Sequence, residues 1–482
     1  MSRSDSLTGN KELAFRRIIP ETRLVRAIGA PSVSRLRLVV HGSQKRSVRG
    51  APSAFGRVSG RSPLVGLILI LSLAICSGAA QAEAPAPVAS KLQLLTSFFE
   101  NEVAERRIAG AVLLIQQHGR PVYLKNFGVR SVRTNRPMTT DTMFALRSMT
   151  KPITGVAAMM LVDAGQMFLD DPVAKYIPSF AEAKVAIEAR NAPGGLPYEL
   201  VAPARQPTIR DLLLQTSGIA GEYVGGWVGK LYEEGHLFDG RVTNADLAER
   251  LSRLPLTRQP GTFWRYGYSS EVLGRVIEVA SGKTLYNFMK QNIFDPLGMT
   301  HTKFVLDTKE RALMAEPLPD DTNLVEQERS LRSHPEWQSG GGGLVSTITD
   351  YARLAQMLLN GGTLGGKRYL SPAAFQDLAT DHIGPGSGVD HDWLYFPGDG
   401  FGYGYGLAVR TGPGEKNQPG SIGELKWDSL SGTYVGIDRR LDMFYLLMEQ
   451  VDNNRGPIRV ALRKLIYDAF TPDNVGRTAD AP

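Results

Sequence analysis

The sequence is nearly free of cysteine, which limits how the chain can be stabilised and what it can bind. Cys76 is the one cysteine among 482 residues, and it lies in an apolar stretch that we interpret below as a secretory signal. Ile75 before it is not the small residue that a lipid-attachment site would need. The exported chain would therefore hold no thiol, no disulfide and no cysteine metal ligand. A chain of this length buries enough surface to fold without disulfides.

Three motifs of common enzyme and nucleotide sites are also missing. No Gly-x-Ser-x-Gly occurs, which argues against an α/β-hydrolase, and none of the seven histidines forms His-Glu-x-x-His. The four glycines at 340–343 are not followed by Gly-Lys-Ser/Thr, so they do not form a phosphate-binding loop. We interpret His391-Asp392 as a solvated pair rather than a metal site. We expect no metal and no cofactor.

The first 82 residues differ from the rest in composition. Residues 1–62 contain 13 Lys+Arg against 3 Asp+Glu, and residues 63–82 follow with a short apolar run that ends in Ala80-Gln81-Ala82. This order is typical of a secretory signal, so we expect cleavage near Ala82 and delivery to the bacterial periplasm or outside the cell. The run is shorter than the roughly 20 residues of a membrane span, although an uncleaved anchor is the alternative. After cleavage no stable membrane span is expected.

Removing this leader reverses the sign of the net charge. Residues 83–482 keep 42 of the 55 Lys+Arg and 45 of the 48 Asp+Glu, a slight acidic excess. The basic character of the whole chain is therefore no indication of nucleic-acid binding, and no nucleic-acid partner is expected.

The most informative motif in the remaining chain is Ser148-Met149-Thr150-Lys151, the one place where a lysine follows a serine by three residues. On a helix such residues share one face, so the hydroxyl and the amine would lie side by side. A serine hydroxyl becomes a good nucleophile when a base removes its proton, and a lysine whose pKa is lowered can be that base. The alternative is a serine N-cap followed by a solvated lysine.

The residues after the motif predict a buried helix that begins near Ser148. Pro152 is tolerated in a first helical turn, and residues 153–162 are apolar nearly all round. Gly165 is a plausible end of the helix. Ser148 would then lie at the positive end of the helix dipole, which favours a developing oxyanion.

Strand patterns lie toward both ends of this region, with helix and loop between them. Residues 111–124 and 433–448 are predicted to form hairpins, and residues 90–106 and 459–470 to form helices. This order predicts one sheet built from both ends, with a helical lobe inserted over residues 146–339.

Together with these features, four segments resemble the serine β-lactamase/penicillin-binding superfamily, in the branch of class C β-lactamases, DD-peptidases and family VIII esterases. The segments are residues 144–151, 208–218, 260–266 and 339–346. The resemblance implies an α/β (α+β) three-layer sandwich, with an antiparallel sheet flanked by helices and an inserted, mostly helical lobe. The hydrolase domain would be residues 83–482, with a sheet lobe at about 91–145 and 340–482 and a helical lobe at about 146–339.

The resemblance also implies roles for individual residues. Ser148 would form an acyl-enzyme and Lys151 would take its proton. The Tyr-x-Asn motif of the branch reads Tyr266-Gly267-Tyr268 here. Tyr266 would carry a proton to the leaving group and later help to activate water, with Tyr268 as the competing assignment. Tyr268 otherwise replaces the asparagine that contacts the side chain of a lactam.

The third motif of the branch departs from the Lys-Thr-Gly of β-lactamases and the Trp-Gly-Gly of many esterases. The matching place reads Trp427-Asp428-Ser429, with Leu430 next. The backbone N–H groups of Leu430 and Ser148 would form the oxyanion hole. Trp427 and Asp428 would lie beside the substrate, where a carboxylate would repel an anion. Lys426 is one residue out of place and would point to the other face of the strand.

These departures favour a neutral small-molecule ester or amide over a penicillin, because β-lactams and D-Ala-D-Ala ends carry a carboxylate that the motif lysine normally meets. We therefore expect an exported serine hydrolase that cleaves carboxylic esters. A β-lactamase or D-Ala-D-Ala carboxypeptidase-type peptidase is the first alternative. A catalytically silent binding protein on the same scaffold is the second. The sequence does not indicate the oligomeric state.

Overall fold

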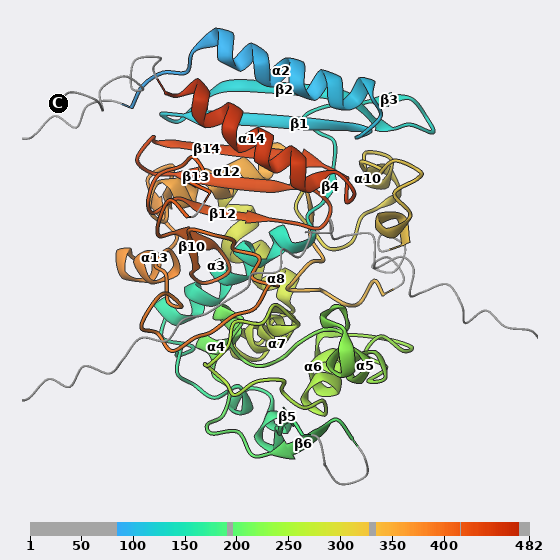
Figure 1. Ribbon diagram of the computed structural model, residues 1–482, viewed down its shortest axis with the longest axis vertical. Helices are drawn as coiled ribbons and strands as arrows, with labels where there is room; N and C mark the ends of the chain where they lie inside the picture. The colour runs from blue at the N-terminus through green and yellow to red at the C-terminus, as the bar shows by residue number, and fades with distance from the viewer. Residues whose placement is uncertain (1–83, 190–195, 327–333, 415, 472–482) are drawn as a thin grey trace, which may run out of the picture. The chain divides into compact units, whose positions relative to one another are not determined.

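The computed structural model describes residues 84–189, 196–326, 334–414 and 416–471 (Figure 1). The predicted leader and signal, residues 1–82, lie outside these ranges. Within them, no helix is both long enough and apolar enough to pass through a lipid bilayer.

An antiparallel sheet of eight strands forms the centre of the described chain, in the order β10-β11-β12-β13-β14-β1-β2-β3. Its strands are β1 (Gly110–Gln117), β2 (Arg120–Ser131), β3 (Arg136–Pro137), β10 (Phe401–Tyr403), β11 (Ala408–Arg410), β12 (Leu425–Asp428), β13 (Tyr434–Asp438) and β14 (Met443–Glu449). The early and late strands meet where β1 pairs with β14, with Leu113 opposite Leu447. The two predicted hairpins are confirmed as β1–β2 and β13–β14.

Two helices from opposite ends of the chain cover one face of the sheet (Figure 1). They are α2 (Ala89–Ala104) and α14 (Arg455–Ala469), and they confirm the two predicted terminal helices, although α14 begins four residues earlier than expected. Phe99 of α2 and Leu462 of α14 pack with Leu113 of β1 and Leu447 of β14 in one buried cluster. Alternate residues of each strand supply this cluster, because successive side chains on a strand point to opposite faces.

The other face of the sheet packs on a larger core. Val112 of β1 and Leu446 of β14 join residues of α12 (Ile348–Leu359) and α3 (Thr150–Asp163) in that core, next to α13 (Pro372–Leu378). Nearly every residue of α3 is buried, as the apolar pattern predicted. Gly155 allows the close packing of α3, because a Cβ there would lie 2.4 Å from the carbonyl oxygen of Tyr405.

The segment between α3 and α12 in the sequence forms a mostly helical lobe, most of it on the side of α3 away from the sheet (Figure 1). Its helices are α4 (Ile209–Leu214), α5 (Gly226–Glu233), α6 (Asn244–Ser252), α7 (Ser269–Ser281), α8 (Leu285–Met289), α9 (Asp295–Leu297) and α10 (Thr308–Arg311). Short strand pairs join β4 (Phe144–Ala145) to β7 (Val345–Ser346), β5 (Val185–Glu188) to β6 (Tyr198–Val201), and β8 (Thr363–Leu364) to β9 (Lys367–Arg368). The β5–β6 pair was not predicted. Its strands are short, and several of their side chains are exposed, so they lack a long alternating pattern.

Candidate active site

Ser148 lies in a tight turn between β4 and α3. Residues Arg147–Met149 form one 3-10 turn, and the α-helix itself begins at Thr150, so Ser148 precedes the helix rather than lying in it. Arg147 has a φ of 49°, a left-handed backbone conformation that costs a non-glycine residue about 1–2 kcal/mol. Such strained residues occur where the surrounding fold must hold a side chain in a set position. The residue that follows Arg147 is Ser148, so the strained turn positions the Ser148 side chain.

The structure brings three of the sequence-predicted residues together around one hydroxyl. The phenol of Tyr266 donates a hydrogen bond of 2.7 Å to Ser148 Oγ. Lys151 Nζ lies 3.5 Å from the same oxygen. Lys151 Nζ also lies over the Tyr266 ring, 4.5 Å from its centre. The hydroxyl therefore has both a proton acceptor and a proton donor within reach.

Lys151 is held in a buried position where its charged form is disfavoured. Its Nζ donates to the carbonyl oxygen of Gly341 at 2.7 Å. Burial lowers the pKa of Lys151 from 10.5 to about 8, against the opposing charge of Glu271. A Cβ on Gly341 would lie 2.4 Å from Glu271 Oε1 and 3.3 Å from Lys151 Nζ. The glycine at 341 thus lets the backbone approach the amine.

Glu271 is a buried acid of this site that the sequence reasoning did not identify. It lies on α7, where its Oε1 accepts from Ser339 Oγ at 2.8 Å and from the Gly341 N–H at 3.1 Å. Burial raises the pKa of Glu271, while Lys151 and these hydrogen bonds lower it. The available signal was an acid five residues after Tyr266, on the face of α7 that also carries apolar residues, and it has no meaning until Lys151 is placed beside it.

Tyr266 stands just before α7 among other aromatic rings. Its ring centre lies 5.1 Å from that of Phe396 and 6.1 Å from that of Trp427. Burial raises the pKa of Tyr266, and the nearby negative charges of Asp428 and Glu271 raise it further, while the hydrogen bond with Ser148 lowers it. The phenol therefore stays protonated at neutral pH.

Tyr268, the competing assignment, points elsewhere. Its phenol donates to Glu222 Oε2 at 2.7 Å, and its ring lies beside Phe238. Between the two tyrosines of the motif, the geometry therefore places Tyr266 on Ser148 and Tyr268 on Glu222.

Strand β12 separates the residues of the third motif onto two faces. Trp427 is buried on the face of β12 that is directed toward Tyr266. Asp428 pairs with Arg459 of α14, with 3.2 Å between Oδ1 and Nη1, and Lys426 Nζ lies 4.1 Å from the centre of the Phe401 ring. We therefore do not count Asp428 among the groups that contact substrate, because successive strand residues point to opposite faces.

The turn after β12 lies against the residues that lead into Ser148. Thr433 Oγ1 donates to the carbonyl oxygen of Leu146 at 3.2 Å, and Ser431 Oγ donates to that of Ala145 at 3.0 Å. Leu430 is in this turn, and its N–H donates no hydrogen bond within the described part of the chain. An N–H that stabilises an oxyanion must be without another acceptor in this way.

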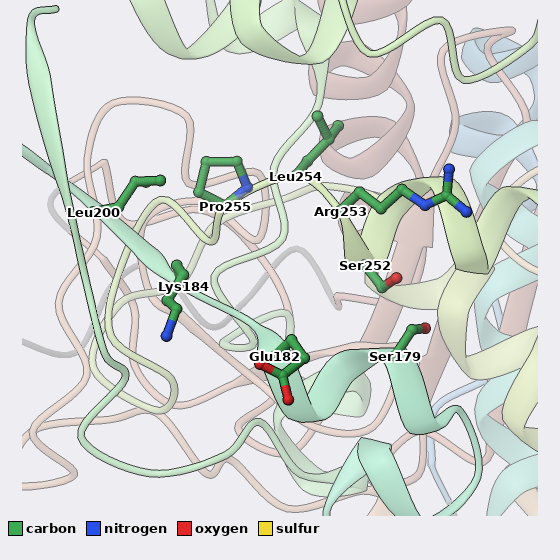
Figure 2. A pocket seen from close by; sticks show the side chains of 8 residues that line it. All are labelled: Ser179, Glu182, Lys184, Leu200, Ser252, Arg253, Leu254 and Pro255. Carbon is green, nitrogen blue, oxygen red and sulfur yellow. The ribbon is translucent and has the colours of Figure 1, made fainter. Parts of the chain in front are cut away.

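Elsewhere the described residues offer less chemistry. They contain no group of three or more His, Cys, Asp or Glu side chains that could hold a metal ion. A hollow of about 400 Å³ lies in the helical lobe beside β5 and β6, and none of Ser148, Lys151 or Tyr266 lines it (Figure 2). Its lining residues are Ser179, Glu182, Lys184, Leu200, Ser252, Arg253, Leu254 and Pro255.

Comparisons with known proteins give the family of the chain. Residues 95–465 match the model of the beta-lactamase family. Protein Rv1367c of Mycobacterium tuberculosis is 33% identical over 356 residues, which cover 71% of this chain and 86% of that protein. Esterase EstB of Burkholderia gladioli is 31% identical over 404 residues, covering 79% and 96%. The solved structure of EstCE1, described as a hydrolase with promiscuous acyltransferase activity, matches at a TM-score of 0.66 and 25% identity, covering 78% of this chain and 98% of that chain.

These matches confirm the resemblance found in the sequence and the three-layer fold that it implies. The chain belongs to the beta-lactamase family, and it is a serine hydrolase within that family.

Proposed function

We propose that this protein hydrolyses carboxylic esters through an acyl-enzyme on Ser148. The observation that carries the proposal is the position of the Ser148 hydroxyl, 2.7 Å from the Tyr266 phenol and 3.5 Å from the Lys151 amine. In its neutral form Lys151 accepts the proton of Ser148, and Oγ attacks the ester carbonyl carbon. The negative charge that develops on the carbonyl oxygen is stabilised by the N–H groups of Ser148 and Leu430.

Tyr266 completes the proton transfers. Its phenol donates a proton to the departing alcohol and regains one from Lys151, whose amine lies against its ring. In the second half of the reaction, the attacking water molecule gives its proton to neutral Lys151 through the Tyr266 phenol, and the same amine returns a proton to Ser148 Oγ when the acid leaves. No net proton is gained or lost by the side chains over one turnover.

An ester is favoured over a β-lactam or a D-Ala-D-Ala end because the third motif presents no positive charge to the substrate. The face of β12 next to Tyr266 presents the indole of Trp427, whereas Lys426 lies over Phe401. A substrate carboxylate would therefore meet an indole where the β-lactamases have a lysine. One relative, EstB, is named an esterase, and EstCE1 is described as a hydrolase.

The proposal is tested by labelling the purified protein separately with a fluorophosphonate and with a penicillin, followed by peptide mass spectrometry. We expect the fluorophosphonate alone to add mass to the Ser148 peptide, and Ser148→Ala to abolish both labelling and turnover of p-nitrophenyl esters. Labelling by both reagents would support the β-lactamase or peptidase alternative. An unlabelled protein whose weak ester turnover is the same in Ser148→Ala would support the silent binding protein.

We also propose that the protein is exported to the periplasm or beyond and that its signal is removed near Ala82. The basic segment, apolar run and small residues of 1–82 support this. Expression of the full chain in a Gram-negative host, followed by fractionation and N-terminal sequencing, tests it. A new N-terminus near residue 83 in the periplasmic fraction is expected, and an intact chain that stays in the cytoplasm would contradict it.

A further inference from the structure

We infer that Arg459 is a positioning residue of the oxyanion hole, holding the Ser429–Leu430 peptide so that the Leu430 N–H faces the reacting carbonyl oxygen. The inference rests on the proposed function. It starts from two arginines of α14 that reach the turn after β12. Arg459 Nη2 donates to the Ser429 carbonyl oxygen, and Arg455 Nη1 donates to the Leu430 carbonyl oxygen at 3.1 Å.

The guanidinium of Arg459 is itself fixed by a second partner. Nη1 lies 3.2 Å from Asp428 Oδ1, so the planar group spans the side chain of one residue and the carbonyl of the next. The Arg459 side chain is only 15% exposed. A planar guanidinium with two partners of this kind keeps its orientation better than an amine on a flexible chain. This gives a structural role to Asp428, which departs from the third motif of the family. Its carboxylate holds the arginine and does not face the substrate.

The turn itself limits the Ser429–Leu430 peptide in the same way. The Ser429 carbonyl oxygen also accepts from the Gly432 N–H at 3.2 Å, and the Ser429 N–H donates to the Thr433 carbonyl oxygen at 3.0 Å. Gly432 has a φ of 93°, and a Cβ there would lie 2.6 Å from Glu449 Cγ, so the turn needs glycine at this point.

A peptide unit is planar and trans, so its N–H points opposite to its C=O. With the Ser429 carbonyl held on the α14 side, the Leu430 N–H must point away from α14. Thr433 Oγ1, at the end of the same turn, bonds the Leu146 carbonyl oxygen two residues before Ser148. Arg459 of α14 thus holds the orientation of this peptide together with the Gly432 N–H.

The positive charge adds to this geometric effect. A cation that donates to a carbonyl oxygen polarises the peptide and makes its N–H a stronger donor. The loss of one oxyanion donor lowers kcat by about 10²–10³-fold in measured enzymes, so a donor that is turned but not removed should lower it by about 10–100-fold.

The test compares Arg459→Ala, Arg459→Lys and the wild type by ester kinetics and by inhibition with phenylboronic acid. In the inhibited enzyme Ser148 Oγ bonds to boron, its proton passes to Lys151, and a boron oxygen occupies the oxyanion hole. We expect Arg459→Ala to lower kcat by about 10–100-fold and to leave KM near the wild-type value. The affinity for phenylboronic acid should fall by a factor similar to that of kcat. The kcat and boronic acid affinity of Arg459→Lys should lie between those of the wild type and Arg459→Ala, because one amine cannot hold both Asp428 and the Ser429 carbonyl.

Lys464→Ala is the matched control, because Lys464 lies on the same helix and pairs with Asp468, away from the turn. It should keep the wild-type kcat and boronic acid affinity. Wild-type kcat and boronic acid affinity in both Arg459 variants would overturn the inference. If Arg459→Ala does not fold, Arg459→Lys alone decides, and wild-type values in it overturn the inference. Failure of the proposed function would look different, because the wild type itself would then lack turnover that depends on Ser148.

Discussion

The amine of Lys151 packs against the ring of Tyr266, with Nζ 4.5 Å from the ring centre. Both groups also reach the same oxygen of Ser148, so the proton acceptor and the proton donor of the proposed reaction contact each other as well as the nucleophile. Burial acts on them in different directions. It lowers the pKa of the amine, which prepares it to take a proton, and raises the pKa of the phenol, which keeps a proton available to give.

This difference predicts the pH dependence of the reaction. Only the neutral amine of Lys151 can accept the Ser148 proton, and its pKa is about 8. kcat/KM for a neutral p-nitrophenyl ester should therefore rise about tenfold per pH unit well below that pKa and level off above it. Initial rates between pH 6 and pH 10, corrected for spontaneous hydrolysis, measure the profile. A flat profile, or one that falls from pH 6 to pH 8, would show that Lys151 is not the base.

Replacing Glu271 should move that profile. The negative charge of Glu271 favours the protonated amine and so raises the pKa of Lys151. Glu271→Gln keeps an oxygen for Ser339 Oγ and the Gly341 N–H but removes the charge. We expect the midpoint of the pH profile to move below about 8, because the neutral amine is then favoured at lower pH.

The matched control is Glu278→Gln, because Glu278 lies on the same helix and pairs with Arg275. Its midpoint should stay where the wild type has it. A midpoint that rises in Glu271→Gln would contradict the account of the Lys151 pKa.

The two tyrosines of the motif allow a paired substitution. Tyr266→Phe removes the donor 2.7 Å from Ser148 Oγ, and the loss of general acid–base catalysis should lower kcat by about 10²–10⁴-fold. Tyr268→Phe removes the hydrogen bond to Glu222 and should leave kcat close to the wild-type value. Steady-state kinetics on one short-chain ester compares them. A larger loss in Tyr268→Phe than in Tyr266→Phe would exchange their assignments.

Glu449 of β14 predicts a pH dependence of stability rather than of activity. It is fully buried, and neither carboxylate oxygen has a hydrogen-bond partner within the described residues. Burial raises the pKa of Glu449 from 4.5 to about 8, so the native state keeps a proton that the unfolded chain releases above about 4.5. The free energy of unfolding therefore falls as pH rises from about 5 to 8. Below pH 4.5 both states hold the proton and the penalty is absent.

Glu449→Gln cannot ionise, so its stability relative to the wild type should increase between pH 5 and pH 8. Urea unfolding at the two pH values measures this difference. An identical difference at both would mean that Glu449 does not titrate in this range.

Features that depend on residues close together in the sequence could be predicted from it. The Ser148–Lys151 spacing lies within one turn, and the hairpins and terminal helices follow from local periodicity. The sequence was insufficient where contacts come from distant segments. Glu271 reaches Lys151 only because α7 packs on α3, and Arg459 reaches Ser429 from a helix thirty residues later. Asp428 was predicted to lie beside the substrate together with Trp427, but adjacent strand residues point to opposite faces, so Asp428 shares the face of Lys426.

The most direct measurement is to trap the intermediate itself. The enzyme is mixed with excess of a p-nitrophenyl ester, quenched in acid within the first turnovers and digested for mass spectrometry. We predict that the peptide containing Ser148 gains the mass of the acyl group, that the gain disappears in Ser148→Ala, and that it grows with pH toward about 8 as Lys151 loses its proton. Ester turnover that proceeds with no acyl group on Ser148, or that persists in Ser148→Ala, would contradict the account.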